Sequence, residues 1–234
     1  MAAGTLASTR LVFDSISYQK PVRLLSSPTA GFLLWKPKFL GHKVQSGFGL
    51  GQLSYTVNLP NEVTGFGSLF SPVGIPISEF VRQMPFQSRM GIKIMRTVLS
   101  SLSLGNIFLP GHLSNIFVQL NSKRQLVIDG SYSSKKEILL STIQKRLTNA
   151  FLKIGVLLVP GSFISGPAGG GVHYAGTIPM KRNPELGESS KFGQPTGTTN
   201  LYVVDGATLP YLSEQSHTLT IMANADRIAK HIVT

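Results

Sequence analysis

The chain of 234 residues contains no cysteine. This absence excludes disulfides, thiolate-bound zinc and cysteine nucleophiles together, and it leaves the redox compartment and the cellular location unassigned. No run of eighteen apolar residues occurs either, so the sequence predicts no membrane-spanning helix. The hydrophobic content of 42% is nevertheless enough for a packed core. These features together indicate a globular protein.

Acidic residues are scarce, since 10 Asp and Glu stand against 22 Lys and Arg, for a formal net charge of +12. Such an excess of positive charge can attract nucleic acid or anionic lipid. The basic residues, however, occur as isolated pairs, and no pair grows into a run of five or lies beside an aromatic-glycine RNA-binding signature. These pairs are Lys36/Lys38, Lys123/Arg124, Lys135/Lys136, Lys145/Arg146 and Lys181/Arg182. We therefore expect no nucleic-acid partner.

Two further kinds of site are not expected. None of the five histidines stands at metal-ligand spacing from another His, Asp or Glu, so no metal site is predicted. A Gly-x-Gly-x-Gly spacing occurs between Ser46 and Gln52. A strand-like segment follows it, whereas a nucleotide-binding loop must open a helix, so we interpret this stretch as a turn.

Hydrophobic periodicity predicts a mixture of helices and short strands. Helices are expected at residues 5–13, at 77–104 in two pieces broken by Pro85, at 134–154 and at 218–232. Strands are expected at 32–35, 52–59 and 201–204, and a hairpin at 115–120 and 125–129. One side of the last helix should be apolar, formed by Ile221, Met222, Ala225, Ile228, Ala229 and Ile232.

Three blocks near the carboxyl end carry the chemistry. They are "HYAGTIPM" at 173–180, "NLYVVDGATLP" at 200–210 and "SHTLTIMANADRIAKHI" at 216–232. In this order and spacing they resemble the carboxy-terminal signature of the glucose–methanol–choline (GMC) oxidoreductases, a family of FAD-dependent enzymes. The segment "AAGTLASTRLV" at 2–12 resembles the place where the FAD domain of that family closes.

The resemblance implies an enzyme that oxidises a small-molecule alcohol or sugar to a carbonyl compound, with FAD as the hydride acceptor. It assigns His173 as the base that takes the hydroxyl proton, and His217 as the residue that holds the substrate oxygen. The residues that it places in contact with the cofactor are Asp205, Gly206, Thr218, Leu219, Gly4 and Thr5. The first turn of the last helix would face the reduced flavin with its free backbone N–H groups.

The resemblance also implies an α+β fold: a substrate domain of antiparallel sheet with helices on one face, plus the carboxy-terminal remnant of an FAD-binding α/β domain. The expected boundaries are 1–19 for the end of the FAD-binding domain, 20–170 for the substrate domain and 171–234 for the flavin-contacting segment. The amino-terminal Gly-x-Gly-x-x-Gly unit of the family is missing. The chain is therefore expected to be a fragment, or to work with a separate chain that supplies the FAD-binding half. The alternative is a non-catalytic remnant that serves as a structural or binding module.

Overall fold

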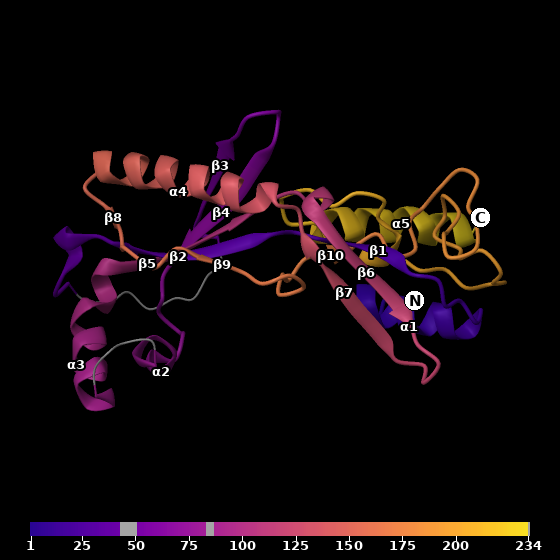
Figure 1. The fold of residues 1–234 in the computed structure, drawn as a ribbon, viewed down its shortest axis with the longest axis horizontal. Coiled ribbons are helices and arrows are strands. Elements are labelled where there is room, and N and C mark those ends of the chain that lie inside the picture. The colour runs from indigo at the N-terminus through magenta and orange to yellow at the C-terminus, as the bar shows by residue number, and fades with distance from the viewer. Residues whose placement is uncertain (43–50, 83–86, 234) are drawn as a thin grey trace. The chain divides into compact units, whose positions relative to one another are not determined.

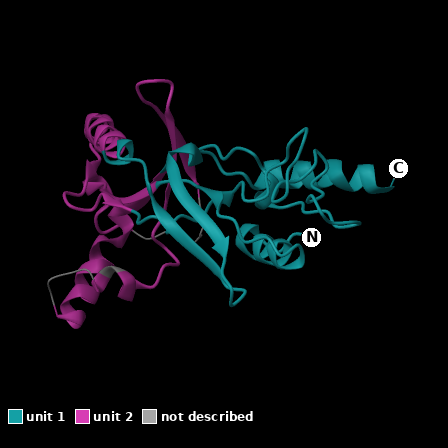
Figure 2. Ribbon diagram, turned by 45° about the vertical axis from the view of Figure 1, so that its right-hand side comes forward, with its two compact units in different colours: residues 1–28, 108–137, 166–234 teal, residues 29–107, 138–165 magenta. Residues whose placement is uncertain are grey.

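The computed structural model describes residues 1–42, 51–82 and 87–233. Most of the glycine-rich stretch at 46–52 and the helix break at Pro85 lie outside these residues. The described chain divides into two compact units, and each is made of segments distant in sequence (Figure 2). Unit 1 contains residues 1–28, 108–137 and 166–234, and unit 2 contains residues 29–107 and 138–165.

Unit 1 is built on a four-stranded sheet in the order β10-β1-β6-β7, and all three neighbouring pairs are antiparallel. Its strands are β1 (Val22–Ser26), β6 (Ser114–Leu120), β7 (Leu126–Tyr132) and β10 (Tyr174–Ala175). Its helices are α1 (Thr5–Ser15), α5 (Thr218–Val233) and the short 3-10 turns η3 (Gly111–Leu113) and η4 (Gly206–Thr208). Both ends of the chain belong to this unit (Figure 2).

The core of unit 1 forms where α1 meets the segments around β10 and η4. Val12 and Phe13 are fully buried and cluster with residues that come from near the other end of the chain: Ile178, Val203 and Ala207. Two polar residues of α1 are buried beside them because their hydroxyl groups have partners. Ser8 Oγ donates to Asp205, and Thr9 Oγ1 lies 2.5 Å from Thr177 Oγ1. The amino-terminal helix is thus fixed by contacts with the carboxy-terminal region.

Unit 2 contains a six-stranded sheet in the order β3-β4-β5-β2-β8, with β9 also paired to β2. Its strands are β2 (Thr29–Trp35), β3 (Leu53–Asn58), β4 (Thr64–Phe70), β5 (Leu102–Phe108, whose last residue belongs to unit 1), β8 (Leu157–Leu158) and β9 (Ile164–Ser165). Its helices are α2 (Ile77–Val81), α3 (Ser88–Val98), η1 (Pro37–Phe39), η2 (Leu99–Ser101) and most of α4 (Lys135–Lys153). Helix α4 lies across β3 and β4 and buries Leu140, Ile143 and Leu147 (Figure 1).

The structure confirms the α+β class and most predicted elements. The hairpin forms as β6 and β7, with Leu120 opposite Leu126, and the helices at 5–13 and 218–232 form as α1 and α5. None of the helices within the described ranges is long and apolar enough to cross a membrane.

Two expectations were wrong. Residues 102–104 are the start of strand β5 rather than part of a helix. Leu102, Gly105 and Ile107 are buried inside the unit 2 sheet, and the pairing of β5 with its neighbouring strands outweighs the local helical pattern. Residues 201–204 form no strand. Val203 is buried, but its N–H donates to Gly193 O, and Val204 N–H donates to Met1 O, without a continuing ladder. The apolar side of α5 is only partly buried, since Ile228 is fully buried and Met222 is 62% exposed.

Candidate functional site

His173 is placed by strand β10, which begins at the next residue. Tyr174 pairs with Ser26 of β1, and the Ser27 N–H donates to His173 O at 3.4 Å. The loop before His173 passes close to the same strand, because a Cβ atom at Gly171 would lie 2.9 Å from Ser27 O. Only glycine allows this approach of one backbone to another. The position of His173 is therefore set by the edge of the unit 1 sheet.

His217 is placed by helix α5, which begins at the next residue. The His217 carbonyl accepts a hydrogen bond from Ile221 N–H at 2.9 Å, and this is the first intrahelical bond of α5. The backbone N–H groups of the first turn, at Thr218 and Leu219, therefore precede the hydrogen-bonded part of the helix. The imidazole of His217 thus stands at the positive end of a helix of 16 residues.

The two imidazole rings lie in contact. Their centroids are 4.9 Å apart and the ring planes meet at 76°, an edge-to-face arrangement. His173 also packs against Phe108, with centroids 4.7 Å apart. Both rings are partly buried, and the Nδ1 atom of each is buried without a hydrogen-bond partner in the described structure. The structure thus brings together the two histidines that the sequence predicted as a pair, although they lie far apart along the chain.

Burial determines the protonation state of this pair. Burial lowers the pKa of His173, and the neighbouring His217 lowers it further. Burial also lowers the pKa of His217. Both shifts go below the ordinary value of 6.5, so both rings are neutral at pH 7. A neutral imidazole has a lone pair that can accept a proton.

Four of the other predicted residues form a second cluster, at the junction of α1 and η4. One Asp205 oxygen accepts from Gly4 N–H at 2.9 Å and from the Ser8 hydroxyl, and the other accepts from Ala207 N–H at 3.0 Å. Thr5 Oγ1 donates to Tyr174 O at 2.8 Å. The Asp205 carboxylate, only 6% exposed, is thus occupied by groups of the protein itself.

Gly206 joins this cluster to the histidine pair. A Cβ atom there would lie 2.6 Å from Thr5 Oγ1, 2.7 Å from Tyr174 O and 3.7 Å from Ile221 Cδ1. Tyr174 follows His173, and Ile221 lies in the first turn of α5. Gly206 therefore lets α1, β10 and α5 approach one another, and all eight predicted residues lie within or next to this junction.

Residues that the sequence did not predict support the loop that leads to His173. They are Phe108 and a group around Tyr132. Tyr132 Oη lies 2.9 Å from Ser26 Oγ, and Tyr174 Oη donates to Gly169 O at 2.6 Å. Lys136 is buried, and its ammonium donates to Gly166 O at 2.7 Å and lies 4.9 Å from the centre of the Tyr132 ring. No local pattern indicated the contacts of Phe108 with His173, of Tyr132 with Ser26 and of Lys136 with Gly166, because each joins residues far apart in the sequence.

Residues 162–225 match the family model described as GMC oxidoreductase, and the match contains His173, Asp205, Gly206 and His217. This part of the chain is therefore similar to the carboxy-terminal portion of the GMC oxidoreductases, a family of flavin oxidoreductases. The resemblance stated from the three sequence blocks is thereby confirmed. No curated protein matches the chain.

Proposed function

We propose that this chain supplies the proton-accepting half of an FAD-dependent oxidoreductase that acts on CH–OH groups of alcohols or sugars. The observation that carries the proposal is the contact between two neutral imidazoles, His173 and His217, at the amino-terminal end of α5. The GMC match over the same residues supports it. The domain boundaries that the sequence predicts are part of this proposal, and residues 171–234 form its flavin-contacting segment.

In this proposal His173 accepts the hydroxyl proton of the substrate. A base near neutral pH must be largely unprotonated, and the lowered pKa of His173 meets that requirement. His217 orients the alcohol oxygen through its own ring nitrogen. The buried Nδ1 atoms lack partners, and a polar group of a bound molecule would supply the missing hydrogen bond.

FAD, when bound, supplies the acceptor for the hydride that leaves the carbon. The residues present fit the ring portion of such a cofactor: the first turn of α5, at Thr218 and Leu219, offers backbone N–H groups and a positive helix end. Asp205, Gly206, Gly4 and Thr5 support that turn through the junction described above. The adenosine portion requires a Gly-x-Gly-x-x-Gly unit, which this sequence does not contain.

The FAD-binding half would therefore come from residues outside this sequence, if the chain is a fragment, or from a separate chain. Two apolar side chains of α5 support a surface that such a half would cover, since Leu219 is 77% exposed and Met222 is 62% exposed. Large apolar groups gathered on one helix face are typical of surfaces that bind another molecule.

The test is the visible spectrum of the tagged chain purified with its bound partners from its own cells. We expect oxidised-flavin absorption that bleaches when an alcohol or sugar is added without oxygen. His173→Ala should keep the flavin and slow the bleaching by about a hundredfold or more, the usual contribution of a general base. His231→Ala, in the last turn of α5, is the matched control and should bleach at the wild-type rate.

Two results would overturn the proposal. One is a purified complex without flavin, which would favour a non-catalytic remnant acting as a binding module. The other is flavin that bleaches equally fast in the wild type and in His173→Ala.

A further inference from the structure

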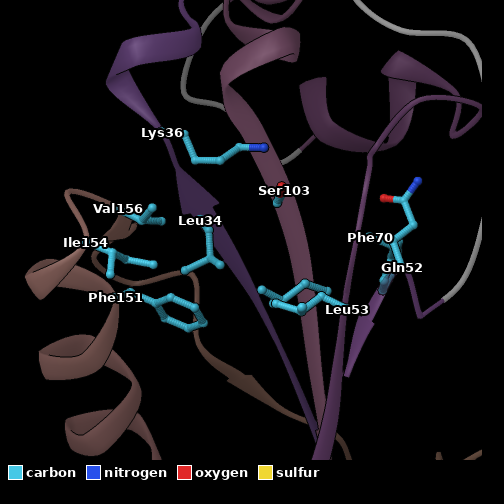
Figure 3. Close-up of a pocket in the computed structure, with 10 residues that line it drawn as sticks. Leu34, Lys36, Gln52, Leu53, Phe70, Ser103, Phe151, Ile154 and Val156 are labelled. Carbon is cyan, nitrogen blue, oxygen red and sulfur yellow. The ribbon is translucent and has the colours of Figure 1, made fainter. Parts of the chain in front are cut away.

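Unit 2 contains a pocket that the histidine chemistry does not use. It has a volume of about 280 Å³ and lies between the carboxyl end of α4 and one face of the unit 2 sheet (Figure 3). Its wall is largely apolar, formed by Leu34, Leu53, Leu69, Phe70, Phe151, Ile154 and Val156. A second cavity of about 420 Å³ shares Leu53, Leu69 and Phe151 with it. The two cavities therefore lie next to each other along α4.

One end of the pocket is polar. Lys36, Gln52 and Ser103 complete the lining, and in Figure 3 the Lys36 side chain extends toward Ser103. The Lys36 backbone is fixed, because its N–H donates to Ser101 O at 2.7 Å. Since side chains of a strand alternate between faces, Lys36 shares the face of Leu34, and Trp35 points to the opposite core with Met95 and Leu102.

No carboxylate neutralises Lys36 within the described ranges. Its nearest aromatic contact is the Phe39 ring, whose centre lies 5.3 Å from Nζ. Unit 2 as a whole has 10 Lys and Arg but only two acidic residues, Glu62 and Glu79. Glu79 pairs with Arg82, and neither glutamate lines the pocket. Burial lowers the pKa of Lys36, because its charged form is partly removed from solvent.

The other cation that lines these two cavities already has a hydrogen-bond partner. Arg146 lines the second cavity and donates to the Asn58 carbonyl. Among the described residues that line the two cavities, Lys36 is thus the cation that can pair with a ligand. The ligand must match an apolar pocket with a positive charge at one end.

We propose that this pocket binds a small amphiphilic anion, a medium-chain carboxylate, with its hydrocarbon chain between α4 and the sheet and its carboxylate on Lys36. The carboxylate would form a charge-assisted hydrogen bond with the ammonium. The chain would replace water along Leu53 and Phe151, and its burial would favour longer chains until the pocket is filled. This site needs no flavin and is independent of the histidine pair.

The test is calorimetric titration of the purified chain with sodium octanoate, and with 1-octanol and octylammonium as matched head groups. We expect octanoate to bind at least about tenfold more tightly than octanol, and octylammonium to bind most weakly. Hexanoate should bind more weakly than octanoate by about fourfold for each methylene removed. Equal affinity for the three head groups, or no binding of octanoate, would overturn the proposal.

Two variants locate the site. Lys36→Gln should reduce octanoate affinity to that of octanol and leave octanol binding unchanged. The matched control is Lys38→Gln, an exposed lysine two residues away in η1, which should bind octanoate as the wild type does. Ile154→Glu places a carboxylate at a pocket residue that is 69% exposed, so the fold tolerates it, and octanoate should be repelled. Undiminished octanoate binding in folded Lys36→Gln would reject the assignment.

Discussion

The imidazoles of His173 and His217 meet edge to face, with their centres 4.9 Å apart, although one follows a glycine-rich loop and the other precedes a helix. Two such rings cannot both become cationic without repulsion, and each is partly removed from water. Their contact therefore ties the stability of unit 1 to pH.

The first prediction is that the stability of the protein depends on pH through these two histidines. Because the pKa of both histidines is lowered in the folded protein, the unfolded chain binds more protons below pH 6.5. The contribution of the two neutral histidines to the free energy of unfolding is fully present above pH 6.5. It is lost as the pH falls below that value. The urea midpoint should therefore drop between about pH 7 and about pH 5. In a His173→Gln/His217→Gln variant the drop should be smaller, and an unchanged pH profile would contradict the link.

The second prediction concerns the Asp205 carboxylate. It is buried and accepts hydrogen bonds from Gly4, Ser8 and Ala207. Asp205→Ala leaves these donors unpaired and should lower the free energy of unfolding by about 3 kcal/mol or more. Asp129→Ala, at an exposed position of β7, is the control and should change the denaturation midpoint little. Equal midpoints for the two variants would show that the junction does not depend on Asp205.

The third prediction concerns Gly206. An alanine methyl group there would meet Thr5 Oγ1 at 2.6 Å and Tyr174 O at 2.7 Å, so the α1–β10 contact must open. Gly206→Ala should cost about 1–3 kcal/mol of unfolding free energy, as overpacking usually does. Gly31→Ala is the control, because the nearest atom to its added methyl is 3.9 Å away. Thermal denaturation of both variants checks the difference, and equal midpoints would speak against the close packing.

The fourth prediction concerns the loop that precedes His173. Lys136 holds this loop through its hydrogen bond to Gly166 O. Lys136→Met keeps the length of the side chain but removes the donor, so the loop should loosen at a cost of about 1–2 kcal/mol. Hydrogen exchange measured by mass spectrometry should increase in residues 166–173. Lys135→Met, at the exposed neighbouring position, should leave exchange unchanged. Equal protection in both variants would mean that Lys136 does not position the loop.

Elements with strong local periodicity could be predicted from the sequence. The hairpin of β6 and β7 has alternating apolar residues on both sides of a polar turn, and its register follows from that alternation. The helix α5 likewise follows from its pattern, whereas α1 was predicted from a less regular apolar face. The start of β5 at Leu102 could not be predicted, because its strand state comes from neighbours in the unit 2 sheet.

For the candidate site, the sequence predicted which histidines belong together but not what surrounds them. The contact of Phe108 with His173 and the support from Lys136 arise only when distant segments fold against one another. The sequence also gave no sign that Asp205 would be surrounded by donors of the protein itself. Such contacts depend on tertiary packing, which a local pattern does not encode.

The bond between Gly4 and Asp205 joins residues 201 positions apart. At ribosomal rates of about 5–20 residues per second, helix α1 leaves the exit tunnel on the order of ten seconds or more before its binding site is synthesised. Throughout that interval Val12 and Phe13 remain without the carboxy-terminal residues that cover them. Production of this protein in a cell therefore depends on how long a nascent helix can be kept from aggregating.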